Sequence, residues 1–572
     1  MTVTPIVLTE PLKKQSGLKT DLKDFTARRS YDGPYADNLD VDVMIIGAGF
    51  GGTYMLYQMR KEGYNTVLYD AGTEFGGVWH FNSYPGARTD TEVPIYEFSI
   101  PEVYNTWTWS TNYPEYSEIQ RYFRHVDQTL NLSKDAAFET VVTGATYDTD
   151  SAKWTVQTAD GRQAKATFLI VAAGFSSKRY IPNFKGLDKF KGVMHHSSFW
   201  PAEGVETANK RVAVIGSGAS GVQIVQELGP TAKNLCLFHR TPNLALPMRR
   251  KDLVAEKQNQ CKAKYGELYD LRERCFGGFA YEWDERNTLS NTPEEREHFW
   301  QSLWDQGGFR FWLGNYKDYL FDIKANREVY NFWRKKQSSR VADPVKKAIL
   351  FPEEPPHPFG VKRPCLEQNF YEILDLEHVE LIDVTEGSGN DIVEFTERGL
   401  RTNQGEYEFD VIALATGFDA STGGLTNMGL QSIHGTTLKD EWKNGAYTYL
   451  GTTISGYPNM FQVYGPQGPT LLCNGPTAVE VQVRWVRDAI KQIRQQGIKY
   501  IDAQVEAQRG WKTHINELSD RTLFPTVAST YMGGNIPGKV KEQLNYTGGI
   551  AEYKREIRSA LDSWKGFDIV KL

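Results

Sequence analysis

Two glycine-rich turns of identical spacing constrain this chain of 572 residues more than any other feature of its sequence. Each turn follows a short apolar run, typical of a buried parallel strand, and precedes a segment that predicts a helix. The turns read Gly47-Ala-Gly49-Phe-Gly-Gly52 and Gly216-Ser-Gly218-Ala-Ser-Gly221. In this pattern the first glycine makes the turn, the second lets a pyrophosphate approach the backbone, and the third allows close helix packing. The sequence therefore predicts two dinucleotide-binding βαβ units.

The two units differ at the end of their second strand. In the first unit the strand at 65–70 ends in Asp70, whose carboxylate can accept hydrogen bonds from both hydroxyls of a ribose. In the second unit the strand ends without an acid, at His239, Arg240 and Thr241. Basic side chains at this place favour a 2′-phosphate, and so NADP over NAD. The pair predicts an FAD site followed by an NADPH site.

A polar hairpin that feeds an apolar strand ending in glycine occurs twice, at 153–174 and 392–417. Because the second glycine turn lies between them, the predicted fold is α/β, with two Rossmann-like dinucleotide-binding domains, the second inserted in the first. A charged stretch rich in Trp and Tyr predicts a helical subdomain. The predicted divisions are an N-terminal extension (1–40), the first domain (41–175 and 386–572, the latter with C-terminal substrate and cofactor loops), the second domain (176–246 and 343–385) and the helical subdomain (247–342).

Charge and cysteine usage exclude several other classes of function. The net charge of −6, from 65 basic and 71 acidic residues, provides no basic field for nucleic acid or an anionic membrane. The five cysteines are scattered and no CxxC pair occurs, which argues against a disulfide framework, a zinc site and a redox dithiol. No apolar run is long enough to span a membrane, and no secretory signal precedes the first strand. We therefore expect a cytoplasmic protein without a metal.

Two dinucleotides in one chain leave three classes of enzyme: disulfide reductase, simple flavin dehydrogenase and flavin monooxygenase. The missing CxxC removes the first. One segment between the two units favours a flavin monooxygenase. It reads Phe190-Lys-Gly192-Val-Met-His-His196-Ser-Ser-Phe-Trp200-Pro201.

This segment matches the pattern F-x-G-x-x-x-H-x-x-x-W-P at every specified position, and in this the chain resembles the type I Baeyer–Villiger monooxygenases. A second pattern of that family, G-x-W-x4-[FY]-P-G-x3-D, is complete from Gly77 and Trp79 to Asp90. Shorter matches lie at 362–364, 415–419, 456–459 and 535–539, so the resemblance runs from about residue 40 to the C-terminus. Relatives that oxidise nitrogen or sulfur usually replace the Trp-Pro end, so Trp200 and Pro201 favour the Baeyer–Villiger type.

The resemblance implies an enzyme that uses FAD, NADPH and O2 to convert a ketone to an ester or lactone. In such enzymes NADPH reduces FAD, O2 adds at the flavin C4a, and the resulting peroxide attacks the ketone to give a tetrahedral adduct. Arg363 matches the family's active-site arginine and Asp90 the carboxylate that pairs with it. The guanidinium keeps its proton and can stabilise an anionic oxygen, while the carboxylate orients it. Lys362 is expected to contact the 2′-phosphate together with Arg240 and Thr241.

The family patterns imply further roles. Gly77 and Trp79 are expected in the FAD site. His196 is expected to hold the interdomain linker, or to couple nicotinamide rotation to domain motion, and not to act as a catalytic base; Trp200 is expected to pack in the same linker. The chain departs from the family at Ser83, where many relatives have arginine, and at Thr530, where they have a tryptophan thought to touch the NADP ribose and the substrate. Thr530 is therefore a candidate pocket residue that leaves room for bulky ketones.

Two alternatives remain open at this point. A flavin monooxygenase that oxidises soft nitrogen or sulfur nucleophiles has less need of an arginine beside the oxygen it transfers, so Arg363 with Asp90 is the discriminating feature. An NADPH oxidase or flavin-dependent redox sensor suits both glycine turns equally, but it leaves the arginine and aspartate without a purpose. The sequence does not select among cyclic, linear, aromatic and steroid-like ketones.

Overall fold

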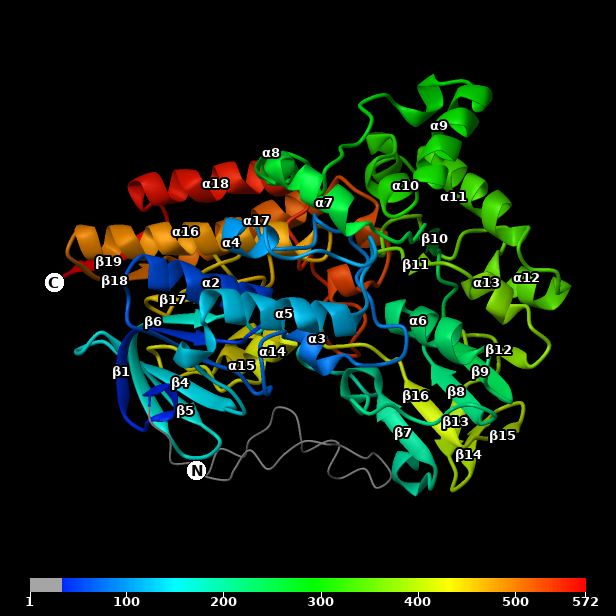
Figure 1. Ribbon diagram of the computed structural model, residues 1–572, viewed down its shortest axis with the longest axis horizontal. Helices are drawn as coiled ribbons and strands as arrows, with labels where there is room; N and C mark the ends of the chain where they lie inside the picture. Colours follow the sequence, from blue (N-terminus) through cyan, green and yellow to red (C-terminus); the bar gives the residue numbers. More distant parts are fainter. Residues whose placement is uncertain (1–32) are drawn as a thin grey trace.

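The first nucleotide-binding domain is built on a seven-stranded sheet (Figure 1). A computed structural model describes residues 33–572, so most of the predicted N-terminal extension lies outside the described residues. The strand order is β3-β2-β1-β6-β5-β4, with β17 also paired to β6. Strands β1, β2, β3, β6 and β17 run parallel, and the antiparallel hairpin β4-β5 feeds β6 as predicted. The strands are β1 (Leu39–Ile46), β2 (Thr66–Tyr69), β3 (Ala136–Ala137), β4 (Val142–Asp148), β5 (Lys153–Thr158), β6 (Gln163–Val171) and β17 (Met460–Gln462).

The second nucleotide-binding domain has a five-stranded parallel sheet of order β12-β9-β8-β16-β7. Its strands are β7 (Val193–His196), β8 (Arg211–Ile215), β9 (Asn234–His239), β12 (Val379–Asp383) and β16 (Val411–Leu414). A three-stranded antiparallel sheet, β13 (Ile392–Phe395), β14 (Gly399–Thr402) and β15 (Glu406–Glu408), leads into β16.

The membership of β16 corrects the predicted boundary at residue 386. Because β16 pairs with both β7 and β8, the chain leaves the second sheet only after Leu414. The hairpin and final strand that the sequence places in the first domain instead complete the second one. In each domain an antiparallel hairpin thus precedes a strand of that domain's own parallel sheet: β4-β5 precedes β6, and β13-β14-β15 precedes β16.

Helices cover the first sheet and form the subdomain at the upper right of Figure 1. In the first domain, α16 (Gly475–Gln495) packs against both α2 (Phe50–Lys61) and α18 (Ile550–Ser563). The other helices of this domain are α3 (Val78–Phe81), α4 (Pro101–Tyr104), α5 (Tyr116–Leu130), α14 (Gly423–Thr426), α15 (Leu438–Glu441) and α17 (Val505–Asp520), beside the pair β18 (Ile498–Ala503) and β19 (Phe567–Lys571). Helices α6 (Ala219–Leu228) and α13 (Phe370–Leu374) pack together on the second sheet.

The stretch predicted as a helical subdomain is helical, but it forms two parts and continues past the predicted end at residue 342. Helices α7 (Ala255–Cys261) and α8 (Tyr265–Arg272) lie on the first domain (Figure 1), where Arg272 forms an ion pair with Glu480 of α16. The helical subdomain consists of α9 (Pro293–Gln306), α10 (Arg310–Leu313), α11 (Ile323–Ser338) and α12 (Pro344–Leu350). Its core is aromatic: Phe332 stacks on Phe311 and contacts the rings of Trp300 and Trp304. The paired strands β10 (Leu246–Pro247) and β11 (Leu366–Glu367) mark where the chain leaves and re-enters the second domain.

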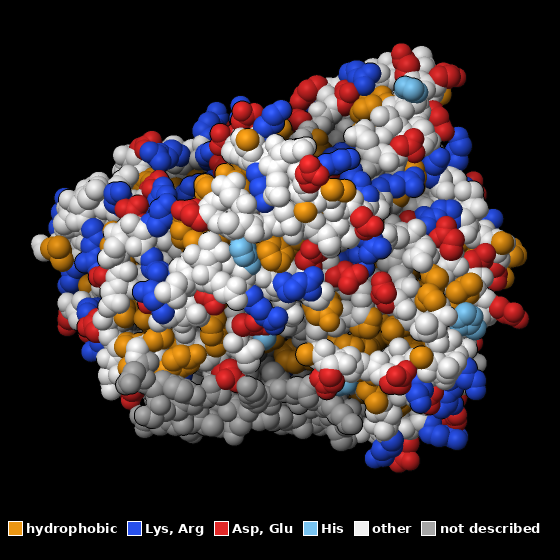
Figure 2. Space-filling model, in the orientation of Figure 1, with side chains coloured by type: hydrophobic (Ala, Val, Ile, Leu, Met, Phe, Trp, Pro, Cys, Tyr) orange, Lys and Arg blue, Asp and Glu red, His pale blue; other side chains and the backbone are white. Residues whose placement is uncertain are grey.

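The segment between α17 and α18, orange to red in Figure 1, passes between the first sheet and the helical subdomain, whereas α16 and α18 lie over the first sheet. On the face shown in Figure 2, basic and acidic side chains are interspersed. All five cysteines are free thiols. Within residues 33–572 no group of three or more His, Cys, Asp or Glu side chains could hold a metal ion, and no helix of that part is long and apolar enough to cross a membrane.

Candidate active site

The first glycine turn is closed by tight backbone contacts. Gly47, at φ +109°, has no room for a side chain, because a Cβ there would lie 2.4 Å from the carbonyl oxygen of Ala172. A Cβ on Gly52 would lie 1.7 Å from the carbonyl oxygen of Gly47. Gly49 faces Gly77, whose own Cβ would approach the Gly49 Cα to 2.6 Å. The two glycines thus bring the second family motif directly over the turn, with bare backbone on both sides.

Asp70 is tied to this turn. Its Oδ2 accepts a hydrogen bond from the Ala48 amide at 2.7 Å and its Oδ1 from the Gly72 amide at 2.6 Å. Burial raises the pKa of Asp70, and the two amides act in the opposite direction. A carboxylate has about four acceptor positions, so Asp70 keeps capacity for a ribose hydroxyl. Nearby, the Trp79 indole donates to the Tyr96 hydroxyl at 3.0 Å.

The second glycine turn repeats the geometry of the first but is open above its middle glycine. A Cβ on Gly216 would lie 2.4 Å from the Ala415 carbonyl oxygen, and one on Gly221 would lie 2.0 Å from the Gly216 carbonyl oxygen. A Cβ on Gly218 would meet nothing within 4 Å. The open space at Gly218 is where a phosphate could approach the N-terminus of α6.

Two cations lie beside this open turn. Burial lowers the pKa of Lys362, and the nearby Arg240 guanidinium lowers it further. No ion pair joins either side chain to a carboxylate within residues 33–572. Thr241 is held to the turn, because Ser217 Oγ donates to its carbonyl oxygen at 3.0 Å. His239, the remaining basic residue at this strand end, is buried 3.8 Å from Asp383.

Arg363 and Asp90, 273 residues apart in the sequence, form a bidentate pair. Arg363 Nε donates to Asp90 Oδ2 at 2.7 Å and Nη2 donates to Oδ1 at 2.8 Å. Burial alone would lower the pKa of Arg363, but the Asp90 carboxylate raises it above its usual value. The guanidinium therefore stays charged at neutral pH and well above it. The Arg363 side chain is 22% exposed, so a reactant can reach it.

Three elements besides Asp90 fix the plane of this guanidinium. Nη1 donates to the Leu471 carbonyl oxygen at 2.8 Å. The guanidinium carbon lies 4.6 Å from the ring centre of Phe309 and 5.6 Å from that of Trp312, both in the helical subdomain. These contacts use three of the five N–H groups of an arginine, so each Nη nitrogen keeps one N–H for another acceptor.

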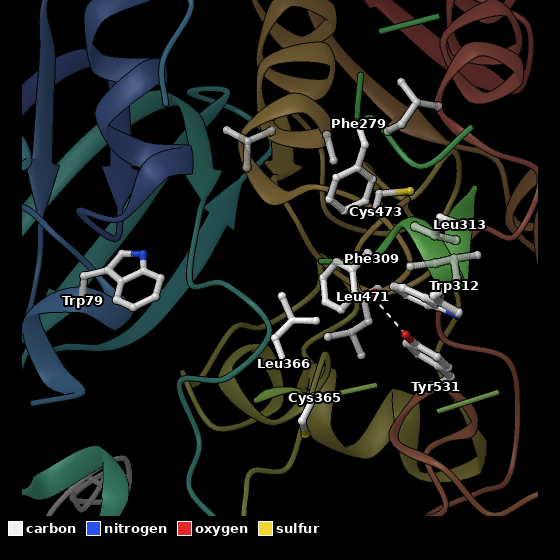
Figure 3. Close-up of a cluster of buried hydrophobic side chains, with 14 of the residues drawn as sticks. Trp79, Phe279, Phe309, Trp312, Leu313, Cys365, Leu366, Leu471, Cys473 and Tyr531 are labelled. Carbon is white, nitrogen blue, oxygen red and sulfur yellow. Dashed lines mark hydrogen bonds between the residues drawn. The ribbon is translucent and has the colours of Figure 1, made fainter. Parts of the chain in front are cut away.

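The surroundings of this pair are apolar and aromatic. Figure 3 shows Phe309, Leu471, Trp312 and Tyr531 side by side, with the Tyr531 hydroxyl directed at the Leu471 carbonyl. That hydrogen bond is 3.1 Å long, and Tyr531 is only 3% exposed. A low-dielectric wall of this kind strengthens the electric field of the Arg363 guanidinium beside it.

The linker segment holds the two domains together through buried contacts. Phe190 is 1% exposed, and a Cβ on Gly192 would lie 2.4 Å from its ring, so the glycine is needed for this packing. His196 is bonded at both nitrogens, Nδ1 with Ser198 Oγ at 2.9 Å and Nε2 with the Gly417 carbonyl oxygen at 3.2 Å. Burial, aided by the nearby Arg179, lowers its pKa to about 3. His196 is therefore a neutral, fully bonded linker residue at neutral pH.

The end of the linker segment contacts the second family motif. Trp200, beside Pro201, is 4% exposed, and Ser83 Oγ donates to its carbonyl oxygen at 2.7 Å. Ser83 thus joins the first domain to the linker. Tyr84 continues the contact, because its hydroxyl donates to Gln223 on α6 at 2.7 Å.

Two of the short family matches also meet. Lys539 forms an ion pair with Asp419 at 2.7 Å and also donates to the Ala420 carbonyl oxygen at 2.9 Å. Asn535 donates to the Phe418 carbonyl oxygen at 2.8 Å. The C-terminal segment is thereby fastened to the chain that leaves the second sheet.

The sequence pointed to Thr530, whereas the side chain that bonds the Leu471 carbonyl, to which Arg363 also donates, is that of Tyr531. Thr530 is half-buried, and none of its hydrogen bonds in the described residues involves Arg363, Asp90 or Leu471. Sequence reasoning missed Tyr531, Leu471, Phe309 and Trp312. The aromatic richness of the helical subdomain was the only available signal for the last two, and a backbone carbonyl such as that of Leu471 has no signal in a sequence.

Known proteins resemble this chain over most of its length. Residues 40–251 match the flavin-binding monooxygenase-like family model. The chain is 50% identical over 552 residues to the FAD-binding monooxygenase acrE of Aspergillus aculeatus, covering 96% of this chain and 93% of that protein. It is 43% identical to cyclopentanone 1,2-monooxygenase of Comamonas sp., covering 93% and 96%. An oxidised steroid monooxygenase bound to NADP superposes with a TM-score of 0.88 at 35% identity, covering 93% of this chain and 100% of that one.

Proposed function

The chain belongs to the Baeyer–Villiger class of flavin-binding monooxygenases, which use NADPH and O2 to convert ketones to esters or lactones, and we propose that it performs this reaction at Arg363 and Asp90. The observation that carries the assignment of residues is the bidentate pair itself. A guanidinium fixed by a carboxylate and a carbonyl, and facing an apolar wall, stabilises negative charge that develops on a nearby oxygen.

We propose that the first unit holds FAD through Gly47, Gly49, Gly52, Asp70, Gly77 and Trp79. The residues fit such a group: the facing backbones of Gly49 and Gly77 leave no side chain in the way of a pyrophosphate. Asp70 retains acceptor positions for a ribose. When bound and reduced, the flavin activates O2 for transfer of one oxygen atom to the ketone.

The second unit is proposed to hold NADPH through Gly216, Gly218, Gly221, Arg240, Thr241 and Lys362. The fit rests on charge. Two cations held close together with no carboxylate between them within the described chain are stabilised by a dianion such as a 2′-phosphate. The space over Gly218 admits the pyrophosphate.

Arg363 has two tasks in this proposal. Its fixed positive charge would keep an oxygen nucleophile beside it deprotonated, and its remaining N–H groups can donate to the ketone oxygen as that atom becomes anionic. Asp90 holds the guanidinium plane and keeps the proton on Arg363; it takes no proton from the substrate. A buried arginine without this partner would cost several kcal/mol.

We propose that His196 and Trp200 hold the interdomain linker in place and take no part in the chemical step. Both nitrogens of His196 are engaged in the linker, and its low pKa removes it as an acid at neutral pH. Phe190, Gly192 and Pro201 belong to the same packed linker. We infer a ketone as the substrate. Cyclopentanone, the ketone in the name of one relative, is the first compound to test.

The test compares Arg363→Ala with Arg211→Ala. Arg211 also forms a bidentate pair, with Asp410 at 3.3 and 2.9 Å, but at the outer end of the second sheet. Both variants are expected to bind FAD and oxidise NADPH. Only Arg363→Ala should lose ester formation, by at least about a hundredfold, as for other lost charge-stabilising donors. Ester formation by Arg363→Ala at a rate equal to that of Arg211→Ala would remove Arg363 from the reaction.

A further inference from the structure

One backbone carbonyl beside the active site accepts two hydrogen bonds from opposite parts of the chain. The Leu471 carbonyl oxygen accepts from Arg363 Nη1 at 2.8 Å and from the Tyr531 hydroxyl at 3.1 Å. A carbonyl oxygen has two lone pairs, so these donors fill its capacity. The acceptor of the Arg363 hydrogen bond that does not go to Asp90 is thus shared with a tyrosine of the C-terminal segment.

The other side of Leu471 is held by the same segment. Its amide donates to Asn545 Oδ1 at 3.0 Å. Asn545 is 1% exposed and also bonds to Thr470. The Tyr531 carbonyl oxygen accepts from the Leu544 amide at 2.9 Å, which ties both ends of the segment together. Tyr531 and Asn545 therefore hold the Leu471 residue at its carbonyl and at its amide.

The hydroxyl of Tyr531 has the properties of a permanent donor. Burial raises its pKa far above the ordinary value, so it keeps its proton at any pH used for assay. Its ring packs edge-on against Phe524 at 5.4 Å, a contact that a phenylalanine would preserve. Packing and hydrogen bonding can therefore be separated by removing one oxygen atom.

We propose that Tyr531 is a positioning residue for Arg363, acting through the Leu471 carbonyl that both side chains bond. This inference rests on the proposed role of Arg363 and adds the residue that sets its orientation. With the Tyr531 bond in place the carbonyl is fixed, and the third contact of the guanidinium is fixed with it. Without that bond the carbonyl can rotate with Arg363, and the two free N–H groups are held less firmly.

The kinetic test uses Tyr531→Phe, with Tyr330→Phe as the matched control. Tyr330 is also buried and donates to a backbone carbonyl, that of Pro352 at 2.6 Å, but inside the helical subdomain. For Tyr531→Phe we expect unchanged FAD content and ketone KM, a three- to tenfold lower kcat for ester, and a matching rise in H2O2 per NADPH, the size of one buried hydrogen bond. The control should change none of these.

A second experiment tests whether the two side chains share the Leu471 carbonyl, and it measures stability instead of activity. Arg363→Met, Tyr531→Phe and the double variant are compared by thermal unfolding. The double variant should lose more Tm than the sum of the single losses, because only then does the buried carbonyl lose both donors. Tyr330→Phe combined with Arg363→Met should be additive.

The outcomes separate the two claims. If Tyr531→Phe behaves as Tyr330→Phe in product share and in Tm additivity, Tyr531 does not position Arg363. If instead Arg363→Ala keeps its ester activity, the proposed function fails. The Tm comparison would still show whether Arg363 and Tyr531 both donate to the Leu471 carbonyl. Should Tyr531→Phe not fold, Asn545→Ala frees the amide side of the same residue. It must then raise H2O2 per NADPH, and a parental value would overturn the proposal.

Discussion

The two nucleotide-binding units use one backbone turn in two different settings. Gly47 and Gly216 have φ values of +109° and +110°, and in each a Cβ would lie 2.4 Å from a carbonyl oxygen of the neighbouring strand end. The turns differ at the middle glycine. Gly49 is faced by the backbone of Gly77, whereas Gly218 has open space above it.

The units also differ in the charge at the end of their second strand. Asp70 turns inward to the first glycine turn, while Arg240 is exposed near Lys362 beside the second. The shared turn makes each unit a dinucleotide site, and the surrounding residues decide which dinucleotide it takes. The predictions below test this comparison.

The largest effect is expected from Gly52→Ala. Its new Cβ would lie 1.7 Å from backbone, so the first turn must open at a cost of about 4 kcal/mol or more. The purified variant should carry little or no flavin, measured as absorbance near 450 nm per protein. Gly221→Ala makes the equivalent clash at 2.0 Å in the second unit and should keep its flavin while losing NADPH binding. The opposite pattern would reverse the assignment of the two units.

Arg240→Ala comes next. Loss of one charge-assisted contact should weaken NADPH by about 1.5–3 kcal/mol, which is roughly 10- to 150-fold, and leave NADH almost unchanged. The ratio of kcat/KM for the two nucleotides measures this change. Asp70→Asn, at the corresponding strand end of the first unit, should not alter that ratio. A parental preference for NADPH in Arg240→Ala would contradict the assignment of the second unit.

The pH dependence of NADPH binding gives a smaller effect. Burial and the Arg240 guanidinium lower the pKa of Lys362, so this ammonium loses its proton at a lower pH than an ordinary lysine. Its attraction for the 2′-phosphate is complete below that pKa and is lost as the pH rises through it. The NADPH KM should therefore rise with increasing pH, and the rise should begin at a lower pH than an ordinary lysine would give.

Two variants check this origin of the pH effect. Lys362→Met should give a higher NADPH KM that no longer rises with pH. Arg240→Ala should move the rise toward higher pH, because one repelling charge is removed. An unchanged profile in Lys362→Met would show that another group titrates.

The smallest effect is expected from Thr530→Trp, in the segment that lies between the first domain and the helical subdomain. Since Tyr531 and not Thr530 reaches Leu471, the added ring should lower kcat/KM of bulky ketones relative to small ones by no more than roughly threefold. The ratio cancels general damage to the enzyme. If the ratio does not change in the folded variant, Thr530 does not line the pocket.

Much of the scaffold could be predicted because it is encoded locally. The strand before Gly47, the helix after it and the strand before Asp70 are present within a few residues of the predicted positions, as are their counterparts around Gly216. The boundary at 386 was wrong because a hairpin followed by an apolar strand does not reveal which sheet it joins. That choice is made by the neighbours of β16 in space.

The candidate site was predictable only in part. Arg363 and Asp90 came from motifs of the family and lie together as those motifs imply. The contacts that hold Arg363 from the other side depend on a main-chain oxygen of Leu471 and on rings of a separate subdomain. These groups meet only after the chain folds, so no spacing in the sequence announces them.

The central claim is that Arg363 directs oxygen from O2 into a ketone, and its most direct test is the fate of that oxygen. The enzyme is given NADPH, 18O2 and cyclopentanone, and ester mass and H2O2 are counted per NADPH oxidised. The parent should place one 18O atom in each lactone, with little H2O2. Arg363→Ala should oxidise NADPH with nearly all electrons recovered in H2O2. Equal lactone labelling and equal lactone yield per NADPH in the two proteins would contradict the account.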